Sequence, residues 1–303
     1  MHRSSYLVLG AAAATAIAVA SVTASAADST AQGTAALVSY DCDSQPSSGL
    51  QAAENSLATG GTLIVSGSCT TGLTLQAETT LAGNNAGTVL HGAITYNSPL
   101  PVTIRDIQVS CGTAPACLNI ENGWRVNIEN IVTYGGATGI ELSAPTCSKP
   151  SGSGCNVNDY LAHNFINNMS GYGIWVNDPA NTITDGFITD SWIAGGTDSI
   201  HLGNAAGWQV VDNHLYGESG NAIYADRLYG SQVTGTYAEQ GGLDLIAQSN
   251  SQPSEIDGNR LNAGTITQTS HGAGCSLTIV GNVTATAPSF TGCTVRKAAN
   301  LFG

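Results

Sequence analysis

The feature that most constrains this 303-residue chain is a short pattern that recurs about every 20 to 26 residues, with one longer interval. In each repeat a polar or aromatic residue stands between two apolar ones. Side chains on a β-strand alternate between its two faces, so the middle residue should face solvent while its neighbours are buried. The repeats are Leu118–Ile120, Ile140–Leu142, Ile174–Val176, Ile200–Leu202, Ile223–Ala225 and Leu243–Leu245.

A second series of small polar residues lies upstream of these repeats, mostly inside segments that also alternate like strands. Its members are Asp106, Asn130, Asn164, Ser191, Asn213, Asn259 and Asn282. Two strand series in one period of this length predict the coils of a parallel β-helix. Because Asn at a turn hydrogen-bonds to nearby backbone, we expect Asn130, Asn164 and Asn213 to form an internal ladder with a structural role.

Residues that hold the same place in successive coils stack in columns at a spacing of about 4.8 Å. The middle residues of the repeats then form one column, which we call the outward column: Asn119, Glu141, Trp175, His201, Tyr224, Asp244 and Thr267. Any solvent-facing strand needs polar residues, so a purely structural column is one interpretation. Aromatic rings and a histidine beside carboxylates favour a functional surface instead.

The N-terminal segment has the pattern of a secretory signal peptide. Arg3 precedes an apolar run over Tyr6–Val22, and Ala24-Ser25-Ala26 forms a cleavage site. We therefore expect residues 1–26 to be removed and Ala27–Gly303 to be a single secreted, extracellular β-helix domain; an uncleaved anchor is the alternative. No later segment is apolar for long enough to cross a bilayer, so no membrane association is expected.

All eight cysteines lie in the predicted mature part, and an even number in an exported chain favours disulfides. Contacts in a stacked fold join neighbouring coils, so cysteines close in sequence should pair. The expected pairs are Cys42–Cys69, Cys111–Cys117, Cys147–Cys155 and Cys275–Cys293, although sequence spacing leaves the connectivity open. The formal net charge of −13 argues against nucleic acid or anionic membrane as partners.

Residues 47–58 place Leu50, Ala53 and Leu57 on one helical face and are followed by Gly60-Gly61. We expect a short N-terminal helix that covers the open apolar end of the first coil, with a first strand over 60–69. This helix, the Gly-Gly-Thr-Leu-Ile-Val segment and strands such as Gly-Ile-Trp-Val at 173–176 resemble the pectin-lyase-like right-handed parallel β-helix superfamily. The resemblance covers essentially the whole predicted mature chain.

The resemblance implies an all-β, single-stranded right-handed parallel β-helix that commonly binds and cleaves polysaccharides along the sheet carrying the outward column. It does not specify the reaction, because the superfamily includes lyases, hydrolases, esterases, epimerases, fructan transferases and phage adhesins. Some relatives are trimers, so a monomer and a homotrimer both stay open. The long interval between Glu141 and Trp175 contains an insertion at 143–156, which we expect to form one wall of a groove.

Candidate reactive residues concentrate in three successive coils. Asp226 lies two residues after Tyr224 and should share its face, about 8 Å from Asp244 on the diagonal of ideal strands. Glycosidases use two carboxyl groups, so we predict Asp226 and Asp244 as the catalytic pair, with a spacing that favours inversion. Glu141 and Asp198 are substitutes for either carboxyl group.

Aromatic side chains and one cation complete the predicted substrate-binding set. Trp175, Tyr224 and Tyr229 offer ring faces to sugars, and Arg227 is the basic residue near the column. No chemistry is assigned to the scattered His163, His214 and His271.

Two alternatives to hydrolysis remain. In a polysaccharide lyase, His201 and Tyr224 would serve as base and acid for β-elimination, with Arg227 or a calcium ion on Asp198, Asp226 and Asp244 neutralising a uronate. No cofactor is otherwise expected. The arginine pattern of pectate lyases is not recognisable, nor is the polygalacturonase set of Asn-Thr-Asp, Asp-Asp, Gly-His-Gly and Arg-Ile-Lys. A non-catalytic glycan-binding or structural β-helix is the other alternative.

Overall fold

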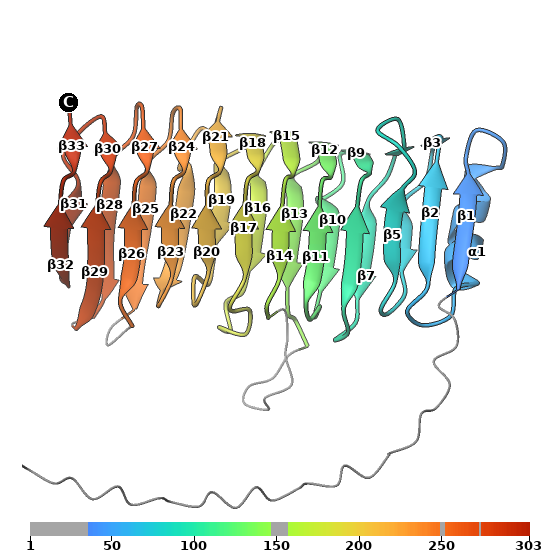
Figure 1. Cartoon of the computed structure of the whole chain (residues 1–303), viewed down its shortest axis with the longest axis horizontal. Coiled ribbons are helices and arrows are strands. Elements are labelled where there is room, and N and C mark those ends of the chain that lie inside the picture. Colours follow the sequence, from blue (N-terminus) through green and yellow to red (C-terminus); the bar gives the residue numbers. More distant parts are fainter. Residues whose placement is uncertain (1–35, 147–156, 249–251, 273) are drawn as a thin grey trace, which may run out of the picture. The chain divides into compact units, whose positions relative to one another are not determined.

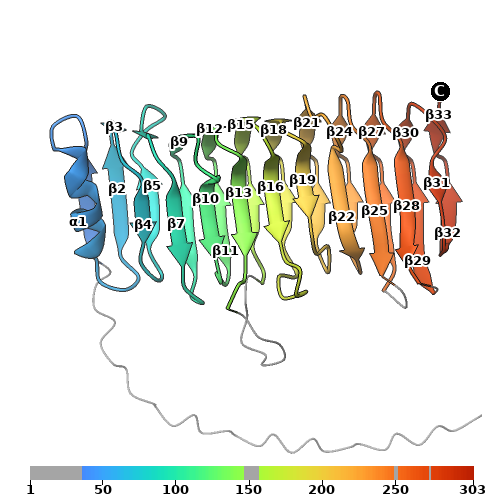
Figure 2. The same cartoon turned by 180° about the vertical axis from the view of Figure 1, so that it is seen from behind.

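The computed structural model describes residues 36–146, 157–248, 252–272 and 274–303, and it is a parallel β-helix (Figure 1). Three parallel sheets of twelve, eleven and ten strands, here sheets A, B and C, form its walls. The chain rises along sheet A on the near side of Figure 1, crosses sheet B at the top and descends along sheet C, as Figure 2 shows from behind. The coils advance from right to left in Figure 1 along this path, so the β-helix is right-handed, as predicted.

Sheet A contains, in spatial order, β1 (Leu37–Asp41), β2 (Thr62–Ser66), β5 (Thr80–Gly83), β8 (Val102–Arg105), β11 (Val126–Glu129), β14 (Tyr160–Ala162), β17 (Phe187–Thr189), β20 (Gln209–Val211), β23 (Gln232–Thr234), β26 (Ser254–Asp257), β29 (Cys275–Val280) and β32 (Cys293–Ala298). Sheet B contains β3 (Ser68–Cys69), β6 (Val89–Leu90), β9 (Gln108–Gly112), β12 (Val132–Gly135), β15 (Phe165–Met169), β18 (Trp192–Gly195), β21 (His214–Tyr216), β24 (Tyr237–Ala238), β27 (Arg260–Leu261), β30 (Val283–Thr284) and β33 (Leu301–Phe302). Sheet C contains β4 (Leu73–Leu75), β7 (Ile94–Asn97), β10 (Ala116–Glu121), β13 (Thr138–Ser143), β16 (Tyr172–Asn177), β19 (Asp198–Leu202), β22 (Ile223–Leu228), β25 (Leu243–Gln248), β28 (Ile266–His271) and β31 (Ser289–Phe290).

The interior is a stack of aliphatic columns. On sheet C, Ile140, Ile174, Ile200 and Ile223 pair in register and are fully buried, which confirms the predicted inward column. Fully burying an aliphatic side chain of this size is worth about 1.5–3 kcal/mol relative to leaving it exposed. Each coil therefore depends on the coils on either side to cover its apolar residues.

The polar ladder exists, but it does not include every residue that was predicted for it. Asn164, Ser191, Asn213, Asn259 and Asn282 are buried, and the side-chain oxygen of each accepts an N–H from the preceding coil at 3.0–3.2 Å. The prediction for Asn130 is wrong: this residue lies one position earlier, at an exposed corner with φ 53°, where its amide donates to Asp106 at 2.7 Å. Asn suits both places, because it tolerates a left-handed backbone as well as a ladder position.

The N-terminal end differs from the prediction in detail. A 3-10 turn, η1 (Ser47–Gly49), leads into α1 (Leu50–Asn55), which ends earlier than residue 58; Leu50 and Leu57 are buried. The segment over 60–69 is not the first strand, because β1 precedes the helix and pairs with β2. Gln51 of the helix pairs with both the N–H and the carbonyl of Thr74 at 2.9 Å, so the helix occupies backbone groups at the edge of sheet C.

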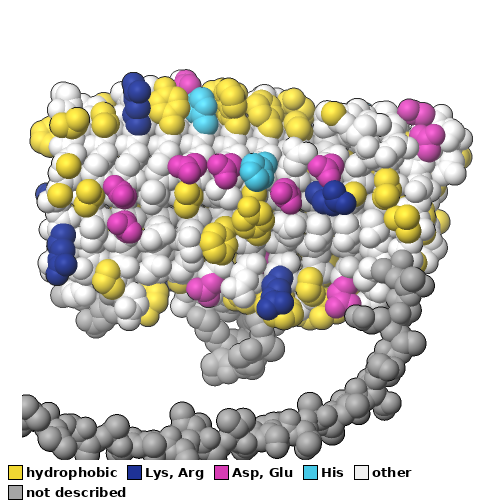
Figure 3. Space-filling view, in the orientation of Figure 1, with side chains coloured by type: hydrophobic (Ala, Val, Ile, Leu, Met, Phe, Trp, Pro, Cys, Tyr) yellow, Lys and Arg dark blue, Asp and Glu magenta, His cyan; other side chains and the backbone are white. Residues whose placement is uncertain are grey.

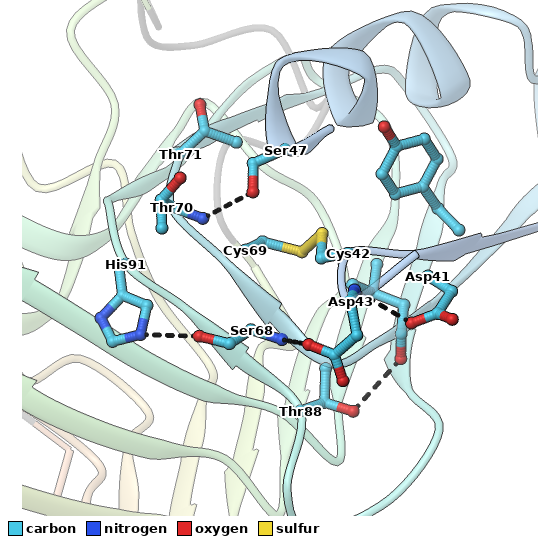
Figure 4. Close-up of a disulfide and its surroundings, with 12 residues drawn as sticks. Asp41, Cys42, Asp43, Ser47, Ser68, Cys69, Thr70, Thr71, Thr88 and His91 are labelled. Atoms are coloured by element: carbon cyan, nitrogen blue, oxygen red, sulfur yellow. Dashed lines mark hydrogen bonds between the residues drawn. A yellow bond between two sulfur atoms is a disulfide. The ribbon is translucent and has the colours of Figure 1, made fainter. Parts of the chain in front are cut away.

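Three of the predicted disulfides are present, Cys42–Cys69, Cys111–Cys117 and Cys275–Cys293. The first joins the segment after β1 to β3, where the Asp43 carboxylate also accepts the Ser68 N–H at 3.1 Å (Figure 4). The predicted pair of Cys147 and Cys155, its loop and the signal peptide lie outside the described residues. None of the helices in the described part is long and apolar enough to span a membrane.

Candidate functional site

The outward column lies on sheet C as predicted. Adjacent strands pair its members one by one, from Asn119 through Glu141, Trp175, His201, Tyr224 and Asp244 to Thr267. Strand alternation was sufficient to find this column because the triplets are regular and stacking keeps them in register.

His201 is held by a buried carboxylate. Its Nδ1 lies 2.7 Å from Oδ2 of Asp198, whose other oxygen accepts the Asn221 N–H at 2.8 Å. An ionised carboxylate only accepts hydrogen bonds, which assigns the proton of neutral His201 to Nδ1 and leaves Nε2 as the basic nitrogen. The ring stacks on Tyr224 with centroids 4.5 Å apart and an interplanar angle of 18°. The imidazole is therefore fixed both by its edge and by its face.

Tyr172 joins this centre and was not predicted. Its ring lies 4.5 Å from that of His201 and 5.1 Å from that of Trp175, and it pairs in register with Asp198. Strict alternation would place Tyr172 on the inward face with Ile174, yet its ring contacts Trp175 and His201. The intervening Gly173 packs against the next coil, where a Cβ would come within 2.4 Å of the Ser199 carbonyl oxygen. Trp175 stands at 86° to His201, so its ring plane runs along the stacking direction.

Two carboxyl groups flank Tyr224 from different positions. Asp244 pairs with Tyr224 across β22 and β25 and has no hydrogen-bond or ion-pair partner among the described residues. Partial burial, and secondly the charge of Asp198, raise the pKa of Asp244. The pKa of Tyr224 is raised by burial and then by the charges of Asp226, Asp244 and Asp198. Three carboxyl groups thus act on one phenol.

Asp226 is placed by a bulge in β22. The register with β25 shifts between Ala225 and Leu228, and Arg227 has φ 51°. Asp226 Oδ1 accepts the Arg227 N–H at 2.8 Å and lies 2.9 Å from His271 Nε2, on β28 two strands away. The predicted spacing of about 8 Å between Asp226 and Asp244 assumed regular strands, and the bulge departs from that geometry. His271 was not among the residues that we predicted for the site.

The bulge also turns Arg227 away from the column. Its Nη1 and Nη2 donate to the carbonyl oxygens of Asp178 and Pro179 at 2.9 and 2.6 Å. Tyr229 lies past the end of β22 and bridges to Ala206. Glu141 stays on the face and accepts the Asn177 amide at 2.9 Å. Of the predicted substrate-binding residues, Arg227 and Tyr229 are thus the two that the local fold moves away from the column.

The calcium alternative finds no support in the described residues, where no group of three or more His, Cys, Asp or Glu side chains could hold a metal ion. Among the three predicted calcium ligands, Asp198 already uses both carboxylate oxygens in hydrogen bonds, one with His201 and one with the Asn221 N–H.

A second row of rings lies on sheet B. Figure 3 shows hydrophobic side chains gathered along this edge of the coil. In its centre His214 stacks on Trp192 at 4.5 Å and lies 2.9 Å from Glu239. Tyr216 and Tyr237 surround this histidine at 5.7 and 4.8 Å. Both His214 and Glu239 therefore lie on a different wall from the outward column.

A separate hollow of 460 Å³ lies beside the end of β8 and β11, lined by Arg105, Asp106, Glu129, Asn130 and His163. None of the predicted site residues contributes to it. Its side chains pair mainly with one another, as in the Arg105–Asp106 ion pair at 2.7 Å. We therefore place the candidate site on sheet C, where the reactive groups gather.

The described part of the chain is a right-handed parallel β-helix. No protein-family model matches its sequence, and no curated protein matches it. Among solved structures it is similar to the A-module of a mannuronan C-5 epimerase from Azotobacter vinelandii, with 11% sequence identity and a TM-score of 0.47. The alignment covers 87% of this chain and 97% of the epimerase module.

Proposed function

We propose that this protein is a secreted carbohydrate-active enzyme that cleaves or rearranges glycosidic bonds of a polysaccharide with the carboxyl groups of sheet C. The observation that carries the proposal is the pair of carboxyl groups with unlike surroundings beside Tyr224. Asp244 is unpartnered in the described part of the chain and its pKa is raised, whereas Asp226 accepts hydrogen bonds. Carboxyl groups in unlike environments are what glycoside hydrolysis requires.

In this proposal Asp244 is the general acid. Burial and the nearby charge of Asp198 raise its pKa, the direction that suits a proton donor, and in this role its proton passes to the glycosidic oxygen as the bond to the anomeric carbon breaks. Asp226 is the base that takes a proton from the water attacking the same carbon. The Arg227 N–H and His271 hold the Asp226 carboxylate in position.

The remaining groups would bind the sugar rings. Trp175 presents an indole whose plane runs along the column, a geometry suited to stacking on a chain that crosses successive strands. Glu141 and the His201–Asp198 pair offer acceptors to hydroxyl groups. Export with removal of residues 1–26 belongs to the same proposal, and disulfides are typical of proteins in oxidising compartments.

A second candidate function is β-elimination, and the observation that favours it is the His201 geometry. Asp198 on Nδ1 leaves Nε2 as a base, and the Tyr224 phenol that stacks on the ring could protonate the leaving oxygen. In this reaction Nε2 takes the proton from the ring carbon next to a uronate carboxylate. The bond between the neighbouring ring carbon and the glycosidic oxygen then breaks, the bond from that oxygen to the anomeric carbon stays intact, and an unsaturated sugar is left.

The test is incubation of the protein purified from residues 27–303 with a panel of polysaccharides. New reducing ends without ultraviolet absorbance support hydrolysis, and an unsaturated product supports elimination. Asp244→Asn should abolish the hydrolytic signal, while Glu239→Gln, which makes the same chemical change on sheet B, should retain it. Glycan binding without any product would leave a binding protein and contradict both reactions.

A further inference from the structure

The strands of sheet C have an unbalanced charge. Arg227 is their single Lys or Arg, against five carboxyl groups: Glu121, Glu141, Asp198, Asp226 and Asp244. The guanidinium of Arg227 already donates to two backbone carbonyl oxygens. No Lys or Arg side chain of these strands is therefore available to bind an anionic group of a substrate, and His201 and His271 are each paired with a carboxylate.

The two carboxylates on the earlier coils are paired with neutral groups, which leaves their charges in place. Glu121 Oε2 accepts the Asn97 amide at 2.8 Å, and its Oε1 accepts the Asn119 amide at 3.3 Å. Glu141 Oε1 accepts the Asn177 amide at 2.9 Å. These amides orient the carboxylates without neutralising them, and the carboxylate oxygens retain acceptor capacity for hydroxyl donors.

From this arrangement we infer that the polysaccharide bound along sheet C carries no carboxylate groups and donates its hydroxyls to Glu121 and Glu141. The inference rests on the proposed function and names its substrate class. Glu121 and Glu141 lie on adjacent strands, about 8 Å apart on the diagonal of ideal strands, which is comparable to the Debye length at physiological salt. A polyuronate would bring a further negative charge with each ring and would meet no free Lys or Arg on the strands of sheet C, so it would be repelled.

The experiment measures binding apart from cleavage. Soluble glucan, mannan and galactan are each compared with the polyuronate made by oxidising their primary hydroxyl groups, in affinity electrophoresis at low salt. Asp244→Asn protein serves as the binding form, so that turnover does not consume the ligand. At least one neutral polymer should retard the protein, and its oxidised counterpart should retard it at least tenfold less per unit concentration.

The charge variant is Glu121→Gln with Glu141→Gln, which preserves size, removes both charges and replaces one acceptor oxygen of each side chain by an N–H donor. It should weaken neutral binding, because hydroxyl acceptors are lost, and gain binding of the matching polyuronate several-fold, whereas Glu129→Gln with Glu255→Gln on sheet A should change neither. Two outcomes overturn the inference and leave the proposed function standing. One is that protein with Glu121 and Glu141 intact binds a polyuronate more strongly than the matching neutral polymer. The other is that the double variant on sheet C gains no binding of the polyuronate. Binding of none of the six polymers contradicts both.

Discussion

Sheets B and C of this β-helix each have a histidine that stacks on an aromatic ring and contacts a carboxylate, but the two carboxylates differ in burial and in hydrogen bonding. On sheet C, His201 stacks on Tyr224 and contacts Asp198; on sheet B, His214 stacks on Trp192 and contacts Glu239, and both ring pairs are 4.5 Å apart. The Asp198 side chain is 7% exposed and tied to the Asn221 N–H, whereas Glu239 is 43% exposed. A solvated pair of this kind contributes little and is free to move.

The surroundings of the two histidines differ as well. Around His201 stand the carboxyl groups of Asp226 and Asp244, close enough to raise the pKa of Tyr224. Around His214 stand further rings, and Arg260 lies over Tyr237 at 5.7 Å. Ring stacking along the coils therefore occurs on both faces, whereas only the His201 pair is flanked by further carboxyl groups, which is why our proposal places the chemistry on sheet C.

The largest effect should come from the carboxyl pair. Asp226→Asn and Asp244→Asn should each lower turnover by about 10²- to 10⁴-fold, the usual contribution of a general acid or base, with the thermal transition unchanged. Glu239→Gln on sheet B should leave turnover at the parental value. Equal activity of all three variants on a substrate that the parent cleaves would place the chemistry elsewhere.

The two histidines sharpen the comparison next. His201→Ala should reduce β-elimination by about 10²- to 10⁴-fold but reduce carboxylate-driven hydrolysis less, because His201 would then only bind substrate. His214→Ala should change neither rate. Steady-state kinetics on the identified substrate measure both, and a larger loss for His214→Ala would reverse the assignment of the two faces.

Asp159 is a buried acid that lies on neither of these two faces. Its titration makes the stability of the fold depend on pH, and this dependence must be separated from the pH dependence of activity. Burial raises the pKa of Asp159 from an ordinary 3.8 to about 7, and its one hydrogen bond, from the Val126 N–H, only partly opposes this. Between these two pKa values, Asp159 is therefore protonated in the folded state and ionised in the unfolded state. This stabilisation is present in full below pH 4 and should fall by about 1.4 kcal/mol per pH unit until pH 7. Denaturant melts should show a smaller decline for Asp159→Asn, and parallel declines would contradict the assignment.

The tryptophans should separate binding from stability. Trp175→Ala should raise KM about 2- to 10-fold, the range expected from 0.5–1.5 kcal/mol of lost ring stacking, with little change in kcat. Trp192→Ala should lower the thermal midpoint and leave KM unchanged, because its ring packs between Phe165 and His214. An increase in KM for both would mean that substrate also reaches sheet B.

The smallest effect concerns the phenol of Tyr224. Removing the charge of Asp244 in Asp244→Asn should lower the Tyr224 pKa towards its usual value, since that charge is among the causes of the rise. The ultraviolet titration difference between each protein and its Tyr224→Phe counterpart isolates this one tyrosine. An unchanged titration would show that burial alone perturbs the phenol.

The sequence by itself determined the coil, the inward isoleucine column and the outward column, and it led us to expect the three local disulfides whose pairing the structure then established. These features follow from rules that act within one strand or between adjacent coils: side chains alternate with a period of two, and stacked repeats keep their register. The spacing of the triplets was for that reason sufficient to place His201, Tyr224 and Asp244 on adjacent strands.

Only the tertiary structure decided which further side chains contact the residues of the outward column. Tyr172 lies on the outward face against His201, His271 of β28 contacts Asp226 beside the bulge in β22, and the Arg227 guanidinium donates to the backbone carbonyl oxygens of Asp178 and Pro179. Asn130 likewise occupies a corner in place of the ladder. Bulges and corners interrupt the alternation, and where they occur depends on the backbone of the neighbouring coil. A pattern read along a single strand contains no information about that contact.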